Sequence, residues 1–143
     1  MFRMSKLIIF FIYLFLFCGC SNEKTPVPSN PFDIYIDLNR VEFNSFSPGT
    51  HVFVTGGGSG FGIVIYRFTD SKFAAFDRMC TSTTHDPTRV NLSEQSDLFL
   101  ECPDCSSKYI IYDGSVISGP ARFFLTEYQT YYYSNSNTLR ITN

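Results

Sequence analysis

The sequence predicts an all-β fold, because short apolar runs with the composition of strands follow one another from Phe32 to the end of the chain. These runs are rich in Val, Ile, Phe and Tyr, which favour strands, and Gly, Pro, Asn, Asp or Ser separate them. No stretch keeps a helical period for more than about two turns. We therefore expect one domain of about eight to ten short strands.

The first expected strand is FDIYIDL at 32–38, where Ile34 and Ile36 face opposite to Tyr35 and Asp37. The aromatic residues of this and the later strands are expected to fill the core. The later expected strands are HVFV (51–54), GIVIYRF (62–68), KFAAFD (72–77), LFLEC (98–102), KYIIYD (108–113), FFLTEY (123–128), TYYYS (130–134) and LRIT (139–142).

A glycine-rich stretch, TGGGSGFG at 55–62, invites comparison with a phosphate-binding loop. Such a loop needs a helix directly after the glycines, whose N-terminus holds the anion. Here the strand-like IVIYRF follows, and the Gly-Lys-Ser/Thr signature is absent. We therefore expect a flexible hairpin loop.

The N-terminal segment 1–20 has the pattern of a targeting signal. Arg3 and Lys6 precede the apolar run 7–17, which is too short to span a bilayer core that needs about 20 residues. The segment ends in FCGC, which resembles the lipobox of bacterial lipoproteins, and this resemblance implies lipidation of Cys20. An ordinary signal peptide or an N-terminal membrane anchor is the alternative.

After processing, the chain would run from Cys20 to Asn143 and carry nine basic and thirteen acidic residues. This balance, with no basic cluster, argues against a nucleic-acid partner. The polar stretch 21–31 contains prolines and is expected to be a flexible tether. Residues 32–143 would then form the β domain, attached to a membrane of the bacterial cell envelope through the lipid on Cys20.

Three cysteines and one histidine fall within 80–105 and together offer four soft ligands. They are Cys80, His85, Cys102 and Cys105. Four such ligands suit a zinc ion or a [2Fe-2S] cluster. The Cys102–Cys105 spacing is also found in redox disulfides, and one disulfide would leave the third cysteine unpaired.

The residues around Cys102 and Cys105 resemble the second half of a Rieske domain. That half reads Cys-Pro-x-His-Gly-Ser-x-Phe/Tyr and continues to Gly, Gly-Pro-Ala and Leu. Sixteen residues separate His85 from Cys102, within the usual spacing between the two ligand loops of that family. The chain also resembles Bacteroidetes-type envelope lipoproteins with a Rieske-like domain. The matching residues, in order, are Cys102, Pro103, Ser107, Tyr109, Gly114, Gly119, Pro120, Ala121 and Leu125.

This resemblance implies an antiparallel β-sandwich base with a small subdomain made of two cluster-binding loops. The chain departs from the family pattern at two places. Four residues separate Cys80 from His85 where the family has one, which indicates an insertion in TSTT; otherwise Ser82 occupies the histidine position. Cys105 stands where the family has its second histidine.

Carried over by position, the resemblance implies that Cys80 and Cys102 bind one iron of a [2Fe-2S] cluster, and that His85 and Cys105 bind the other. The expected function is electron transfer to an unidentified redox or envelope protein. No substrate pocket or acid–base pair is apparent, so we do not expect a stand-alone enzyme. The alternatives are a zinc site, or a cluster-free fold with a Cys102–Cys105 or Cys80–Cys102 disulfide, in a structural or protein-binding lipoprotein.

Overall fold

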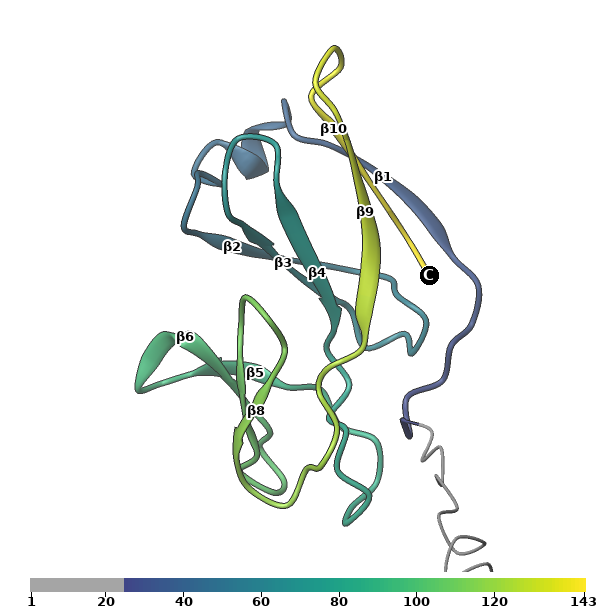
Figure 1. Cartoon of the computed structure of the whole chain (residues 1–143), viewed down its shortest axis with the longest axis vertical. Helices are drawn as coiled ribbons and strands as arrows, with labels where there is room; N and C mark the ends of the chain where they lie inside the picture. The colour runs from purple at the N-terminus through teal and green to yellow at the C-terminus, as the bar shows by residue number, and fades with distance from the viewer. Residues whose placement is uncertain (1–24) are drawn as a thin grey trace, which may run out of the picture.

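The computed structural model describes residues 25–143, which form two antiparallel sheets and one short 3₁₀ helix, η1 (Val41–Phe43) (Figure 1). The predicted signal segment and Cys20 lie outside the described residues. Within residues 25–143, no helix is long and apolar enough to cross a membrane. The predicted all-β antiparallel class is confirmed.

The larger sheet has six strands in the order β1-β10-β9-β4-β3-β2, each antiparallel to its neighbours. It joins the first four strands of the chain to the last two, so strands from both ends of the chain lie side by side in the base of the domain. Its strands are β1 (Asp33–Asp37), β2 (His51–Val54), β3 (Ile63–Arg67), β4 (Phe73–Asp77), β9 (Glu127–Tyr133) and β10 (Thr138–Thr142).

The smaller sheet is a separate layer below the larger one in Figure 1 and has the order β5-β6-β7-β8. Its outer strands, β5 (Asn91–Ser93) and β8 (Val116–Ser118), were not predicted. The inner strands are β6 (Ser96–Glu101) and β7 (Lys108–Ile110). The predicted strand 123–128 is only partly present, because β9 begins at Glu127.

Strands β3 and β4 are buried on both faces, and this explains their nearly continuous apolar sequences, IVI and FAAF. Ile63 and Ile65 point into a core enclosed by the curled larger sheet, whereas Val64 points into a second core shared with the smaller sheet. On β4, Phe76 belongs to that second core together with Cys80. The alternation of side chains along a strand thus places the start of the first ligand loop directly against the smaller sheet.

Part of the segment predicted as a tether lies against the domain. Val27 is buried, and the Asn30 side-chain amide donates a hydrogen bond of 2.8 Å to the carbonyl of Gly58. An added Cβ at Gly58 would lie 3.1 Å from the carbonyl oxygen of Pro28, so the glycine-rich loop and this segment pack backbone to backbone. Residues 21–24 lie outside the described residues.

A fully buried carboxylate, Asp77, holds the chain where it leaves β4 towards Cys80. It accepts hydrogen bonds from the Met79 amide (2.7 Å), from the Ser59 amide (3.1 Å) and from the Ser59 hydroxyl (2.5 Å). The Tyr128 hydroxyl donates a further bond to it. These bonds join the glycine-rich loop, β9 and the first ligand loop at one point.

We expect Asp77→Ala to lower the free energy of unfolding by about 3–5 kcal/mol, because it leaves several buried donors without an acceptor. The matched control is Asp70→Ala, which removes an ion pair with Arg67 from a carboxylate whose side chain is 93% exposed. That change should stay within about 0.5 kcal/mol of the parent. Urea unfolding at equal metal content measures both values. Equal stability of the two variants would contradict the role given to Asp77.

Candidate metal centre

Two loops at the junction of the sheets position the candidate ligands. Cys80 lies three residues beyond the end of β4, and His85 follows in the same loop. Cys102 directly follows β6, and the turn from it to Ser106 closes with the Ser106 amide donating to the Cys102 carbonyl (2.9 Å). This turn lies at the tip of the β6–β7 hairpin, so Cys105 is presented towards the first loop.

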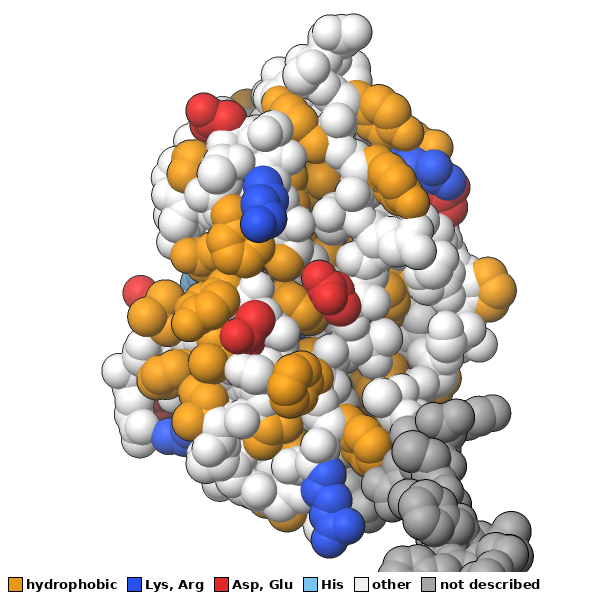
Figure 2. Space-filling model, viewed as in Figure 1, with side chains coloured by type: hydrophobic (Ala, Val, Ile, Leu, Met, Phe, Trp, Pro, Cys, Tyr) orange, Lys and Arg blue, Asp and Glu red, His pale blue; other side chains and the backbone are white. Residues whose placement is uncertain are grey.

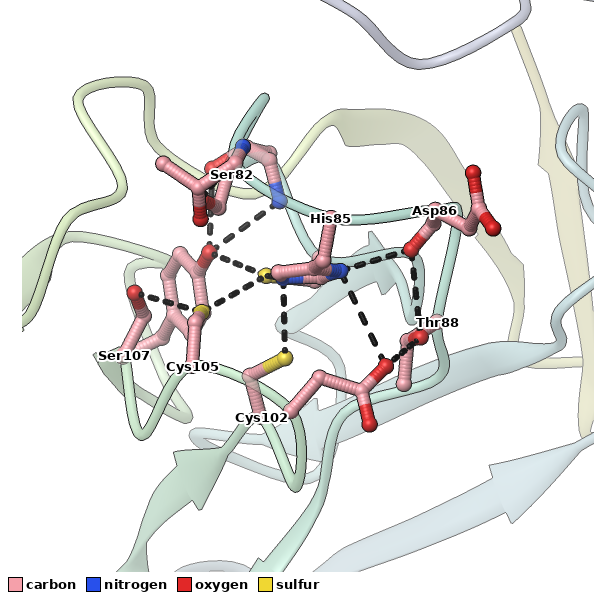
Figure 3. A network of polar contacts seen from close by, with 12 residues as sticks. Ser82, His85, Asp86, Thr88, Cys102, Cys105 and Ser107 are labelled. Carbon is pink, nitrogen blue, oxygen red and sulfur yellow. Dashed lines mark hydrogen bonds and ion pairs between the residues drawn. The ribbon is translucent and has the colours of Figure 1, made fainter.

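The four candidate ligand atoms all lie within 4.8 Å of one another (Figure 3). The Cys80 sulfur lies 3.5 Å from His85 Nε2 and 3.7 Å from the Cys105 sulfur. The Cys102 sulfur lies 3.5 Å from His85 Nε2. The three described cysteines are free thiols, so none of the predicted disulfide alternatives is formed here. All four predicted ligand residues are therefore brought together.

The His85 ring is oriented with Nε2 towards the sulfur atoms. Nδ1 lies 2.6 Å from the carbonyl oxygen of Asp86, which can only accept, so Nδ1 carries the proton and Nε2 the lone pair. Asp104 Oδ2 lies 3.8 Å from Nδ1 and accepts a hydrogen bond from the Thr88 hydroxyl. The Asp86 carbonyl, followed by smaller contributions from Cys105 and Asp104, raises the pKa of His85 despite its burial.

The Cys80 sulfur is in contact with a fully buried tyrosine of β7. The Tyr109 hydroxyl lies 3.3 Å from this sulfur and accepts a hydrogen bond from the Thr81 amide (3.1 Å). The Thr81 hydroxyl in turn donates to the carbonyl of Phe123 (2.5 Å). Burial, supported by the neighbouring thiol, raises the pKa of Tyr109, so its hydroxyl remains a donor.

Cys105 is partly exposed and is held by Ser107, whose hydroxyl lies 3.1 Å from its sulfur. The Ala121 amide donates to the Ser107 hydroxyl (3.1 Å). Gly119, at φ +96°, packs so closely that an added Cβ would lie 2.5 Å from the Cα of Ser107. Burial raises the pKa of Cys105, but the hydrogen bonds from the Ser107 hydroxyl and amide are the main influences that outweigh it and lower the value to about 6. Burial raises the pKa of Cys102 to about 12.

Ser82, the alternative occupant of the histidine position, makes its side-chain hydrogen bond elsewhere. Its hydroxyl lies 2.8 Å from the Thr84 hydroxyl, whereas the His85 ring lies against the sulfur atoms. Sequence analysis gave no role to Tyr109 and Ser107, although both were positions of the matched pattern. Only the match to that pattern could have indicated them, because a tyrosine or serine that contacts a cysteine sulfur has no characteristic spacing in the sequence.

Comparisons with known proteins identify no family. No family model matches the chain, and no curated protein is similar to it. Among solved structures, the chain is similar to one in the complex of reduced oxygenase and oxidized ferredoxin in carbazole 1,9a-dioxygenase. The two chains are 20% identical, and the match covers 80% of this chain and 94% of that chain with a TM-score of 0.47. The ferredoxin of carbazole 1,9a-dioxygenase from Nocardioides aromaticivorans IC177 is 16% identical, with coverage of 79% and 97% and the same TM-score. The superposition is partial, so the arguments below rest on the site's own geometry.

We expect His85→Ala to weaken metal binding at least about 100-fold, because three ligands leave an open coordination position. Ser82→Ala is the matched control from the same loop and should retain the metal content of the parent. Elemental analysis after gel filtration gives the bound metal per chain for all three proteins. If His85→Ala retained as much metal as the parent, His85 would not be a ligand.

Proposed function

We propose that this protein is a lipid-tethered electron-transfer protein of the bacterial cell envelope that binds a [2Fe-2S] cluster through Cys80, His85, Cys102 and Cys105. The observation that carries the proposal is the convergence of these three thiols and one imidazole within 4.8 Å at the tips of two loops. Thiolate is the usual ligand of iron–sulfur clusters, and imidazole replaces it on one iron of Rieske centres. The donor chemistry therefore fits the cluster that the sequence resemblance implies.

When bound, the cluster would supply a site that accepts and releases one electron. The chain's own residues would hold and tune it. The Tyr109 hydroxyl, 3.3 Å from the Cys80 sulfur, and the Ser107 hydroxyl, 3.1 Å from the Cys105 sulfur, can each donate a hydrogen bond to a thiolate. Hydrogen bonds to ligand sulfur withdraw negative charge and so stabilise the reduced form. Burial of Cys80 and Cys102 keeps water from this side of the site.

A second candidate is a single tetrahedral ion, of which zinc is the commonest for such ligands. A two-iron cluster divides its four ligands into two pairs, one on each iron. The three short contacts instead form a chain in which Cys80 contacts both Cys105 and His85, and His85 also contacts Cys102. Each of these contacts joins ligands that the resemblance assigns to different irons.

Three of the six distances between the ligand atoms also match one ion. With metal–sulfur bonds of about 2.3 Å and metal–nitrogen bonds of about 2.0–2.1 Å, a tetrahedral ion separates two sulfur ligands by about 3.8 Å and sulfur from nitrogen by about 3.6 Å. The corresponding separations here are 3.7 Å and 3.5 Å. A zinc ion would make the centre a structural clamp between the loops, whereas a cluster requires the ligands to separate into two pairs.

Anaerobically purified protein should contain about two iron atoms and two acid-labile sulfides per chain and be red-brown if the cluster is bound. One zinc atom per chain without sulfide would favour the single-ion candidate. Elemental analysis and sulfide assay on the same sample separate the two. A colourless, metal-free protein, with thiol counting to detect a disulfide, would contradict both and favour the cluster-free structural lipoprotein.

The tether rests on the lipobox-like end of the signal segment at Cys20. We expect Cys20→Ala either to remain an unprocessed precursor or to leave the membrane fraction, because stable anchoring needs at least two membrane-binding signals and the lipid would supply them. Membrane fractionation and the mass of the mature chain measure this outcome. Processed Cys20→Ala protein that stayed with the membrane like the parent would rule out the lipoprotein assignment.

A further inference from the structure

The described chain begins at the same end of the molecule as the candidate metal loops. Figure 1 shows the purple start of the chain at the lower end of the long axis, with the teal loop after β4 and the green loop after β8, while the β9–β10 hairpin lies at the upper end. Buried Val27 and the bond from Asn30 to the Gly58 carbonyl hold this start against the domain. The exit point of the chain is therefore fixed relative to the loops.

Only a short length of chain separates this exit point from the proposed lipid. Thr25 is five residues after Cys20. A fully extended chain spans at most about 3.6 Å per residue, so these residues reach about 18 Å at most. With lipid on Cys20, the start of the described chain at the lower end of the domain would lie within about 18 Å of the headgroups.

The loop 119–124 at this lower end exposes side chains suited to a lipid surface. Phe124 is 61% exposed, the most exposed phenylalanine among residues 25–143, and Arg122 and Pro120 are exposed beside it. Aromatic rings favour the boundary between headgroups and acyl chains, and an arginine can keep its charge among the phosphates. Figure 2 shows hydrophobic side chains and one basic side chain at the lower end of the visible face.

The neighbouring charges limit this contact to an apolar one. Asp86 is exposed on the first ligand loop, and Asp104 accepts a hydrogen bond from Thr88 beside His85. One arginine does not outweigh these carboxylates, so the loop would give little attraction to anionic lipid by charge. The anchor would supply the affinity, and the exposed ring of Phe124 would set the orientation.

We propose that the loop 119–124 rests on the lipid surface of the anchoring membrane, so that the Cys80–His85–Cys102–Cys105 centre faces the bilayer. The inference rests on the proposed lipidation of Cys20. The first ligand loop is tied to this loop by the bond from the Thr81 hydroxyl to the Phe123 carbonyl (2.5 Å). An electron partner would then be embedded in, or bound to, the same membrane.

The chain contains no tryptophan, so a single Phe124→Trp substitution introduces one fluorophore at the loop. The lipidated protein is reconstituted into phosphatidylcholine vesicles with and without brominated acyl chains. We expect a blue-shifted emission and at least about twofold quenching by the brominated lipid, because the ring would lie at the acyl boundary. The matched control is Tyr133→Trp, at the β9–β10 hairpin and 45% exposed, which should not be quenched.

Vesicle flotation of the same samples separates this inference from the tether. Protein that floats with an unquenched Phe124→Trp fluorophore, or with equal quenching in both variants, overturns the orientation and leaves the anchor intact. Protein that does not float overturns the anchor and the orientation together. Adding Arg122→Glu to Phe124→Trp should reduce the quenching, because a carboxylate beside the ring lacks the long apolar stem by which arginine keeps its charge among the headgroups; unchanged quenching would contradict the contact of the loop 119–124 with lipid.

Discussion

The hydroxyl of Tyr109 is the point on which the arrangement of the candidate centre depends. It accepts from the Thr81 amide, and through Thr81 it is connected to the Phe123 carbonyl, so one buried phenol on β7 joins the first ligand loop to the smaller sheet and to the loop 119–124. Its single proton can go to the Thr81 hydroxyl at 3.1 Å or to the Cys80 sulfur at 3.3 Å. When Cys80 is an ionised ligand, the charged sulfur is the stronger acceptor. Metal binding would therefore strengthen the contact between the Tyr109 hydroxyl and the Cys80 sulfur.

The base of the domain makes this arrangement possible through β4, which is buried on both faces. Asp77 ends that strand, and its bonds to the Met79 amide and the Tyr128 hydroxyl fix the direction in which the chain continues to Cys80. The second core then encloses Cys80 and Tyr109 together. The position of the first ligand follows from strand alternation and one buried carboxylate.

Short apolar runs were sufficient to predict five of the six strands of the base, whereas β9 was predicted as two separate strands, 123–128 and 130–134. The same signal fails where hydrogen bonds replace apolar burial. Asn91–Ser93 forms β5 with only Leu92 as its large apolar residue. Residues 123–125 look like a strand but form a loop, since the Phe123 carbonyl accepts from Thr81 and the Leu125 amide donates to Gly114.

The candidate ligands could be predicted as a set because residue type and spacing limit the choices. The contacts between these ligands could not be predicted, because they depend on how close the turn of the β6–β7 hairpin lies to the first ligand loop. Ser107 contacts the Cys105 sulfur, and Gly119 leaves room for Ser107 because it has no side chain. In this position the Cys105 sulfur lies 3.7 Å from the Cys80 sulfur. The glycine of the matched pattern thus leaves room for a contact that residue type and spacing alone do not predict.

The choice between a cluster and a single ion then depends on the strength of the bonds that cross between the two loops. Three hydrogen bonds join the first loop to the second loop or to β7, which directly follows it: one from Thr88 to Asp104, and one each between Tyr109 and the amide and hydroxyl of Thr81. Together they contribute about 3–6 kcal/mol, counting the charged acceptor as the stronger. Metal binding to four such ligands contributes about 10–16 kcal/mol in small zinc domains. The loops can therefore separate for a cluster, while a single ion binds without that separation.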